Sequence, residues 1–258
     1  MSYWKDRLAE SQNRLTKKSF KQIERQLKKY YGASMKYIIE DFEATYNKVL
    51  AATEDGKQPT PADLYKLDKY WQMQAQMRQE LRKLGDKQIS ALSKAFELNF
   101  FEVYYSIGLE GFEAFNTLDT DIVQQMINNV WVADGKSWSQ RIWDNTQLLA
   151  ETLNEELINC VVGGKKTSDL KKMLQERFSV SYSRADALAR TELAHIQTQA
   201  AQKRYEDYGI QMFEVWADED ERRCEICGKL HEKRYPANAL PPIPAHPRCR
   251  CCIVPVVE

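Results

Sequence analysis

The chain of 258 residues lacks several features that would assign it to a class at once. It has no run of about 18 apolar residues, so the sequence predicts no membrane-spanning helix. The first residues, Met1-Ser-Tyr-Trp-Lys-Asp6, lack an apolar stretch, so we expect no secretory signal peptide. The net charge is zero at pH 7 and therefore argues neither for nor against a nucleic-acid partner.

Motifs of familiar catalytic sites are also missing. The chain has only three histidines and no His-Glu-x-x-His sequence. The pair His231-Glu232 is not the His-x-Glu of zinc deaminases. The sequence Gly163-Gly164-Lys165 lacks the earlier glycine and the leading buried strand of a P-loop. We therefore expect a protein that is not an enzyme.

Charge is distributed unevenly along the chain. Residues 1–36 contain ten Lys and Arg against three Asp and Glu, whereas residues 108–159 contain nine acidic residues against two basic ones. A basic N-terminal arm of this kind could contact phosphates non-specifically, although a solvated helix face explains it as well. Phe20, Tyr30 and Tyr31 lie between the basic residues of the arm.

Apolar residues recur every three or four positions through most of the chain, which predicts a mainly α-helical protein. Gly32 and Gly85 are expected to interrupt helices, Thr60 and either Asp119 or Thr120 to begin them, and Gly209 to end the last one. The expected helices cover residues 2–36, 35–49, 61–84, 89–107, 120–131, 138–158, 167–178 and 181–208.

The C-terminal region differs in composition and pattern. Residues 211–217 alternate as in a strand, and residues 251–257 are its expected partner. The fold class is therefore mainly α, with an N-terminal helical bundle or extended helices followed by a small α+β module with a zinc-stapled β-hairpin. We divide the chain into a helical region at 1–110 and a second domain at 111–258, with the β module at 210–258.

Five of the six cysteines and two of the three histidines fall within the last 35 residues. Cys224 and Cys227 have the two-residue gap that lets two thiolates reach one ion, and His246 and Cys249 repeat that gap about twenty residues later. Gly228 follows where a turn needs relaxed backbone. This spacing predicts a tetrahedral structural Zn²⁺ site.

The ligand set has alternatives. Cys251 could replace His246 or Cys249, because it offers a thiolate two residues after Cys249. Cys252 would point to the other side of an extended strand and is better explained as a small buried residue. His231 could be a ligand but has no partner at ligand spacing. A disulfide or free thiols are the remaining interpretations of the cysteines.

Three thiolates and one histidine leave a net charge near −1 around Zn²⁺, which neighbouring arginines could neutralise. The candidates are Arg222, Arg223, Arg248 and Arg250, although solvated surface positions explain them nearly as well. A treble-clef nuclease of the His-Asn-His type is the alternative function, because its cysteine and histidine pattern overlaps this one. Such a nuclease needs a further histidine base, and His195 is better placed to pack a helix.

Several motifs together resemble the phage head morphogenesis family, whose members are minor head proteins similar to the Mu F protein and the minor head protein of phage SPP1. The motifs are Arg190-Thr-Glu-Leu-Ala194, Tyr208-Gly-Ile210, Val215-Trp-Ala-Asp218 through Cys224-Glu-Ile-Cys227-Gly228, and Pro241 through Cys251. The resemblance covers roughly residues 120–258 and is specific as an ordered set. One departure is the absence of an Asp-Gly pair between Lys229 and Tyr235.

The resemblance implies a minor capsid protein that associates with the portal protein at one vertex of the procapsid. It implies a role in assembly and in genome packaging or delivery, with a place in the virion and, during assembly, in the host cytoplasm. Scaffold or major capsid protein are further expected partners, and no membrane is expected. Arg190 and Glu192 carry over as structural residues, each expected to meet a partner in the C-terminal module.

Overall fold

The fold is described from a computed structural model of the chain. The structure describes residues 3–53, 57–108, 117–217 and 223–257. Within these ranges the protein is mainly α-helical with a small C-terminal sheet, as the sequence predicted. None of the described helices is both long enough and apolar enough to cross a membrane. The predictions that fall on Asp218 and Arg222 lie outside the described residues.

The chain forms two compact units, each assembled from separate stretches of sequence. Unit 1 contains Met1–Glu24, Ala91–Trp138 and Ala187–Glu258, and unit 2 contains Arg25–Ser90 and Ser139–Asp186. The division of the chain at residue 110 stays a prediction.

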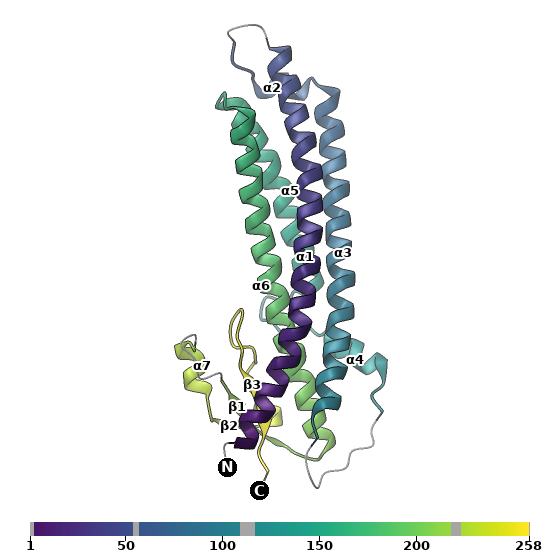
Figure 1. Ribbon diagram of the computed structural model, residues 1–258, viewed down its shortest axis with the longest axis vertical. Helices are drawn as coiled ribbons and strands as arrows, with labels where there is room; N and C mark the ends of the chain where they lie inside the picture. The colour runs from purple at the N-terminus through teal and green to yellow at the C-terminus, as the bar shows by residue number, and fades with distance from the viewer. Residues whose placement is uncertain (1–2, 54–56, 109–116, 218–222, 258) are drawn as a thin grey trace. The chain divides into compact units, whose positions relative to one another are not determined.

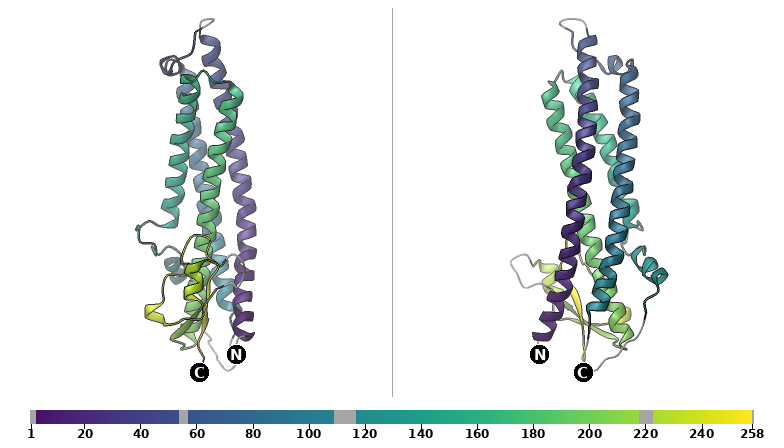
Figure 2. Two further views of the ribbon diagram at one scale, coloured as in Figure 1. Left: turned by 90° about the vertical axis from the view of Figure 1, so that its left-hand side faces the viewer. Right: turned by 45° about the vertical axis from the view of Figure 1, so that its right-hand side comes forward.

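Three long helices contribute to both units, and a fourth lies almost entirely in unit 2. They are α1 (Tyr3–Ala52), α3 (Asp68–Ser106), α5 (Trp138–Val162) and α6 (Thr167–Asp207). In unit 2 the segments of these helices lie side by side (Figures 1 and 2). Their apolar stripes meet in one core, which includes Phe42, Tyr46, Leu81, Leu153 and Leu174. Burial of these stripes stabilises the bundle.

Helix starts follow the predicted capping chemistry. The short helix α2 (Pro61–Tyr65) has Thr60 at its N-cap, and the Thr60 and Asp63 side chains each bond to the other residue's backbone N–H. Helix α4 (Thr120–Ile127) begins at the Asp119 cap, whose carboxylate accepts from the Asp121 N–H. Both predicted starts are confirmed.

The predicted helix interruptions are wrong at three places. Helix α1 continues through Gly32, and α3 continues through Gly85. Helix α6 continues from 167 to 207 without the expected break near residue 180. A glycine costs a helix only about 1 kcal/mol relative to alanine. A long buried stripe on each side of the glycine outweighs that cost.

The sheet of unit 1 has three strands in the order β2-β1-β3. Strand β1 (Met212–Trp216) pairs antiparallel with β3 (Cys252–Pro255), as predicted, and with β2 (Arg234–Pro236), which the sequence pattern did not reveal. Helix α6 ends at Asp207, and Gly209 just beyond it has a φ of 78°, which lets the Gly209 and Ile210 N–H groups bond back to the carbonyls of Glu206 and Tyr205. The predicted helix end is confirmed.

Candidate metal centre

The first pair of candidate ligands lies at the start of a short helix rather than in a turn. Helix α7 (Glu225–Leu230) has Cys224 at its N-cap, and the Cys224 sulfur accepts a hydrogen bond from the Cys227 N–H at 3.4 Å. Gly228 lies inside this helix, so the expectation of a relaxed glycine turn there is wrong. The helix places both sulfurs on one side because its N-cap and third residue face the same way.

The second pair is held by a turn that follows the 3-10 helix η1 (Ala237–Ala239). The Cys249 N–H bonds to the His246 carbonyl at 3.1 Å, which closes the turn. Arg248 within it has a φ of 62°, a left-handed conformation that is uncommon outside glycine. The Thr191 hydroxyl on α6 accepts from the Arg248 N–H at 3.1 Å and so supports this strained residue.

The donor atoms of both pairs converge. The His246 Nε2 atom lies 3.2 Å from the Cys224 sulfur and 3.1 Å from the Cys227 sulfur, and the sulfurs of Cys227 and Cys249 are 3.6 Å apart. In tetrahedral zinc sites the corresponding separations are about 3.6 Å for nitrogen to sulfur and about 3.8 Å for two sulfurs, given the usual bond lengths. The donor set therefore fits a small ion that prefers soft ligands.

Five donors form two overlapping groups. Cys224, Cys227 and His246 make one group, while Cys227, Cys249 and Cys251 make the other. Cys227 is common to both. The structure thus brings together all four predicted ligands and also Cys251, and it leaves the choice of the fourth ligand open. Zinc as the bound ion, and the particular set of four ligands, stay predictions.

The hydrogen bond of His246 uses its Nδ1 atom and leaves its Nε2 atom available to bind a metal ion. Its Nδ1 atom lies 2.9 Å from the Pro247 carbonyl oxygen, which can only accept, so Nδ1 carries the proton. When the ring is neutral, the lone pair of Nε2 then faces the two sulfurs. Histidines that bind metal are typically oriented by a bond of this kind from the other ring nitrogen.

The cysteine thiols differ in acidity. A hydrogen bond from the Cys251 thiol lowers the pKa of Cys249 to about 5, whereas burial raises the pKa of Cys227 to about 12. The bond from the Cys227 N–H lowers the pKa of Cys224, and the pKa of Cys251 is raised because its proton is shared with Cys249. Cys249 is therefore the better prepared thiolate of the last two cysteines. Metal binding would displace the remaining protons.

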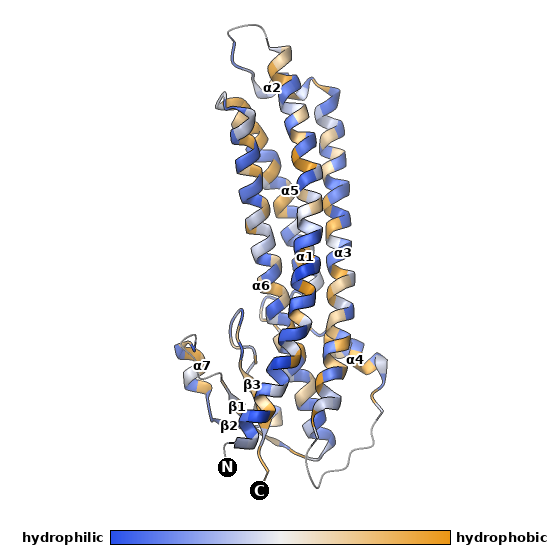
Figure 3. Ribbon diagram, viewed as in Figure 1, coloured by the Kyte–Doolittle hydropathy of each residue, from blue (hydrophilic) through white to orange (hydrophobic). Residues whose placement is uncertain are grey.

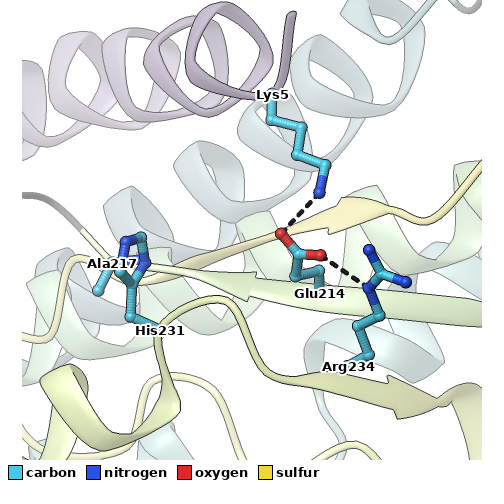
Figure 4. A network of polar contacts seen from close by, with 5 residues as sticks. All are labelled: Lys5, Glu214, Ala217, His231 and Arg234. Atoms are coloured by element: carbon cyan, nitrogen blue, oxygen red, sulfur yellow. Dashed lines mark hydrogen bonds and ion pairs between the residues drawn. The ribbon is translucent and has the colours of Figure 1, made fainter. Parts of the chain in front are cut away.

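Other predicted residues lie elsewhere. Cys252 is fully buried beside Ala9 and Val254, away from the donor cluster, which confirms that it is a packing residue. His231 does not belong to either donor group. Its Nδ1 atom accepts from the N–H of Ala217, which lies beside it in Figure 4, at 3.2 Å. The His231 ring also packs edge-on against Trp216.

The arginines near the cluster are exposed wherever the structure describes them, at 223, 248 and 250. The proposed neutralisation of the cluster's charge by these residues stays a prediction.

The Arg190-Thr-Glu192 motif connects α6 to several other parts of unit 1. The Arg190 guanidinium lies 3.5 Å from the centroid of the Phe20 ring, and Glu192 accepts from the Trp131 indole N–H at 3.0 Å. Both of these partners precede α6, and Thr191 makes one contact with the C-terminal module, through the Arg248 N–H. The expected C-terminal partners of Arg190 and Glu192 stay a prediction.

His195 supports the loop that leads to the donors. It is only 6% exposed, its ring stacks on Trp131 at 4.2 Å, and its Nδ1 atom donates to the Ile243 carbonyl at 3.4 Å. Burial lowers the pKa of His195 to about 4, so the ring is neutral near pH 7. The predicted packing role is confirmed, and nothing in the described residues supports the nuclease alternative.

The sheet carries a buried ion pair that the sequence analysis missed (Figure 4). Glu214 of β1 is 3% exposed and accepts from the Lys5 ammonium at 2.7 Å and from the Arg234 Nε at 3.1 Å. The only available signal was a glutamate between two apolar strand residues. This network fastens the start of α1 to the sheet.

A comparison with protein families matches residues 151–254 to the family described as Phage Mu protein F like protein. No curated protein matches the chain, and no solved structure matches it. The matched segment contains the Arg190-Thr-Glu192 motif, all five donors, strands β1 and β2, and all of β3 except its last residue. Over residues 151–254, which are less than half of the chain, the protein is therefore similar to the family described as Phage Mu protein F like protein.

Proposed function

We propose that this phage head morphogenesis protein is a minor capsid protein of the portal vertex, where it assists procapsid assembly and genome packaging or delivery. The family match over residues 151–254 is the observation that carries the proposal. The portal protein is its principal partner, and scaffold or major capsid protein are further candidates. Its place is the virion, after assembly in the host cytoplasm.

The metal centre has a structural role in this proposal. Cys224, Cys227, His246 and Cys249 would hold Zn²⁺, with Cys251 as the alternative fourth ligand. Four protein ligands leave no position for a reactive water, which favours a closed site over a catalytic one. A three-stranded sheet this small cannot bury much apolar surface, so a bound ion would supply stability that its core lacks.

Quantitative mass spectrometry of purified procapsids and DNA-filled heads tests the proposal. A minor capsid protein should be present at a few copies per particle in both. Its absence from both particles would overturn the proposal, and a copy number near that of the major capsid protein would exclude a role at one vertex.

A second role, contact with packaged DNA, rests on one face of α1 in unit 1. Arg7, Arg14, Lys18 and Lys21 are all exposed and recur at spacings of seven, four and three residues, so they share a face. This segment is largely hydrophilic (Figure 3). Phe20 and Tyr31, two of the aromatic residues that lie between basic residues in the sequence, are buried and are therefore not available to contact DNA.

Charge attraction to phosphates would be independent of sequence and weakened by salt. The Arg14→Glu/Lys21→Glu variant should bind duplex DNA at least tenfold more weakly than the wild type in low salt. Equal affinity of the two proteins, or affinity that does not fall with salt, would remove the DNA role.

A further inference from the structure

Unit 2 carries a groove between α3 and α5 that its bundle core does not fill. The groove has a volume of about 430 Å³. Met77, Leu81 and Ala150 supply its apolar lining, and Arg78, Arg82, Gln147 and Glu151 supply most of its polar lining. We call it the α3–α5 groove. An apolar surface with a few polar groups is typical of a binding site.

Trp143 lies in this groove, and its ring packs closely against the backbone of Gly85 on α3. A Cβ atom at Gly85 would come within 2.4 Å of the Trp143 ring, so only glycine leaves room for the indole. A glycine inside a helix costs about 1 kcal/mol relative to alanine. Trp143 nevertheless remains 37% exposed, so this close contact does not serve to bury it in the core. The arrangement holds an aromatic ring at the surface.

Two arginines of the groove have no charged partner among the residues that the structure describes. Arg78 and Arg82 are exposed and one helical turn apart on α3, and neither makes an ion pair or hydrogen bond with another described residue. The carboxylate of Glu151 already accepts from Gln147 at 3.0 Å. Two guanidinium groups at this spacing are suited to carboxylates of a bound segment, because each offers paired donors.

The same face of α3 continues to Trp71, seven residues before Arg78. Trp71 is 58% exposed. Its ring packs 6.2 Å from that of Tyr65, which is 43% exposed. Tryptophan, tyrosine and arginine are the residue types that contribute most binding energy in protein interfaces. All three types gather along this face of unit 2.

We propose that the α3–α5 groove binds an acidic segment of another phage head protein. Carboxylates of the segment would pair with Arg78 and Arg82, while an apolar side chain would pack on Trp143. Glu151 and the apolar lining favour a protein over a nucleic-acid backbone, which would be repelled by the carboxylate. The choice of a head protein as partner rests on the proposed function.

Photocrosslinking in cells that assemble the phage tests the groove directly. A photoreactive phenylalanine derivative replaces Gln147 in the full chain, and crosslinked peptides are identified by mass spectrometry. We expect a peptide rich in Asp and Glu from a head protein. When Arg78→Glu and Arg82→Glu are introduced into this photoreactive protein, the crosslink should fall at least tenfold.

The matched control is Lys83→Glu/Lys87→Glu. These two lysines are also exposed and one turn apart on α3, but they do not line the groove. The control should keep the crosslink within twofold of the parent protein. Gly85→Ala provides a second variant without a charge change, because the new methyl group displaces Trp143, and it should also reduce the crosslink. Circular dichroism confirms that each variant is folded.

Several outcomes would overturn the groove proposal: no crosslink above that of an exposed position elsewhere on α5, a crosslink to DNA or to a second copy of the chain, or a crosslink that charge reversal leaves unchanged. Failure of the proposed function is a separate result, since it requires that the wild-type protein be absent from purified procapsids and heads. A protein present in both particles with an unoccupied groove would retain its function and lose only this surface.

Discussion

The ion pair between Lys5 and Glu214 should contribute measurably to the stability of unit 1. The Lys5 and Glu214 side chains are only 14% and 4% exposed, and their charged atoms are 2.7 Å apart. Coulomb's law gives about 6 kcal/mol at this distance for an effective dielectric constant of about 20. Desolvation of both groups offsets much of that attraction. We therefore expect a net coupling energy of about 2 kcal/mol.

The second partner of Glu214 contributes less. The Arg234 side chain is 62% exposed, so solvent screens its attraction, and the expected coupling is about 0.5 kcal/mol. The replacement Glu214→Gln should cost more than Lys5→Met, because it leaves the poorly exposed Lys5 ammonium without its carboxylate. A residual attraction to the Trp216 ring, 5.6 Å from the ammonium, remains in that variant.

A double-mutant cycle with Lys5→Met and Glu214→Gln isolates the pair. Amide hydrogen exchange, read by mass spectrometry on peptides that cover β1 and β3, gives the local opening free energy. Lys229→Ala is the control, because its partner Glu225 and Lys229 itself are 81% and 71% exposed. A coupling energy below about 0.5 kcal/mol, equal to that of an exposed pair, would refute the reasoning.

Three further predictions concern the metal, pH and backbone. Cys224→Ala or Cys249→Ala should abolish zinc binding, measured by plasma mass spectrometry. Each variant should also expose the region beyond Gly209 to protease, while the N-terminal helices stay resistant. A metal-free variant that resists protease as well as the wild type would contradict this prediction. Burial lowers the pKa of His195 from 6.5 in the unfolded chain to about 4 in the folded protein. The contribution of the neutral His195 ring to the free energy of unfolding should therefore be fully present above pH 6.5, and the free energy of unfolding should fall by about 3 kcal/mol as the pH decreases to 4. His195→Gln should reduce the pH dependence of the free energy of unfolding between pH 6.5 and 4, measured by urea denaturation. An unchanged pH dependence would mean that other groups cause the loss of stability. Gly209→Ala should destabilise the folded protein by about 1 kcal/mol, because φ is positive at this residue. Gly32→Ala should instead stabilise it by up to about 1 kcal/mol, because Gly32 lies inside α1 with open space around it. Equal changes in thermal unfolding for the two variants would count against this reasoning.

The sequence predicted those parts of the fold that depend on local chemistry. The Thr60 and Asp119 caps, the end of α6 just before Gly209 and the pairing of β1 with β3 follow from side chains within a few residues. Gly32 and Gly85 were misjudged because a local breaker signal carries no information about the tertiary packing on either side of it. Strand β2 has only three residues, too few for an alternating pattern to appear.

The candidate metal site was predictable in composition but not in detail. Cysteine and histidine spacing identified the donors because two-residue gaps act locally. Whether Cys249 or Cys251 would be a ligand depends on the conformation of the turn between His246 and Cys249. Thr191 supports that turn, and because it is distant in sequence, no local pattern could reveal this contact. Glu214 was missed because its two charged partners come from α1 and β2, which no short-range pattern connects.

The donor cluster has an open side and a closed side, which bears on the rate of metal exchange rather than on affinity. Cys227, Cys249 and Cys251 are buried, whereas Cys224 and His246 are partly accessible to solvent. A chelator or a competing metal would therefore approach through Cys224 and His246 and meet the buried thiolates last. If the cluster binds an ion, exchange through this one face should be stepwise, with the bonds to Cys224 and His246 breaking first.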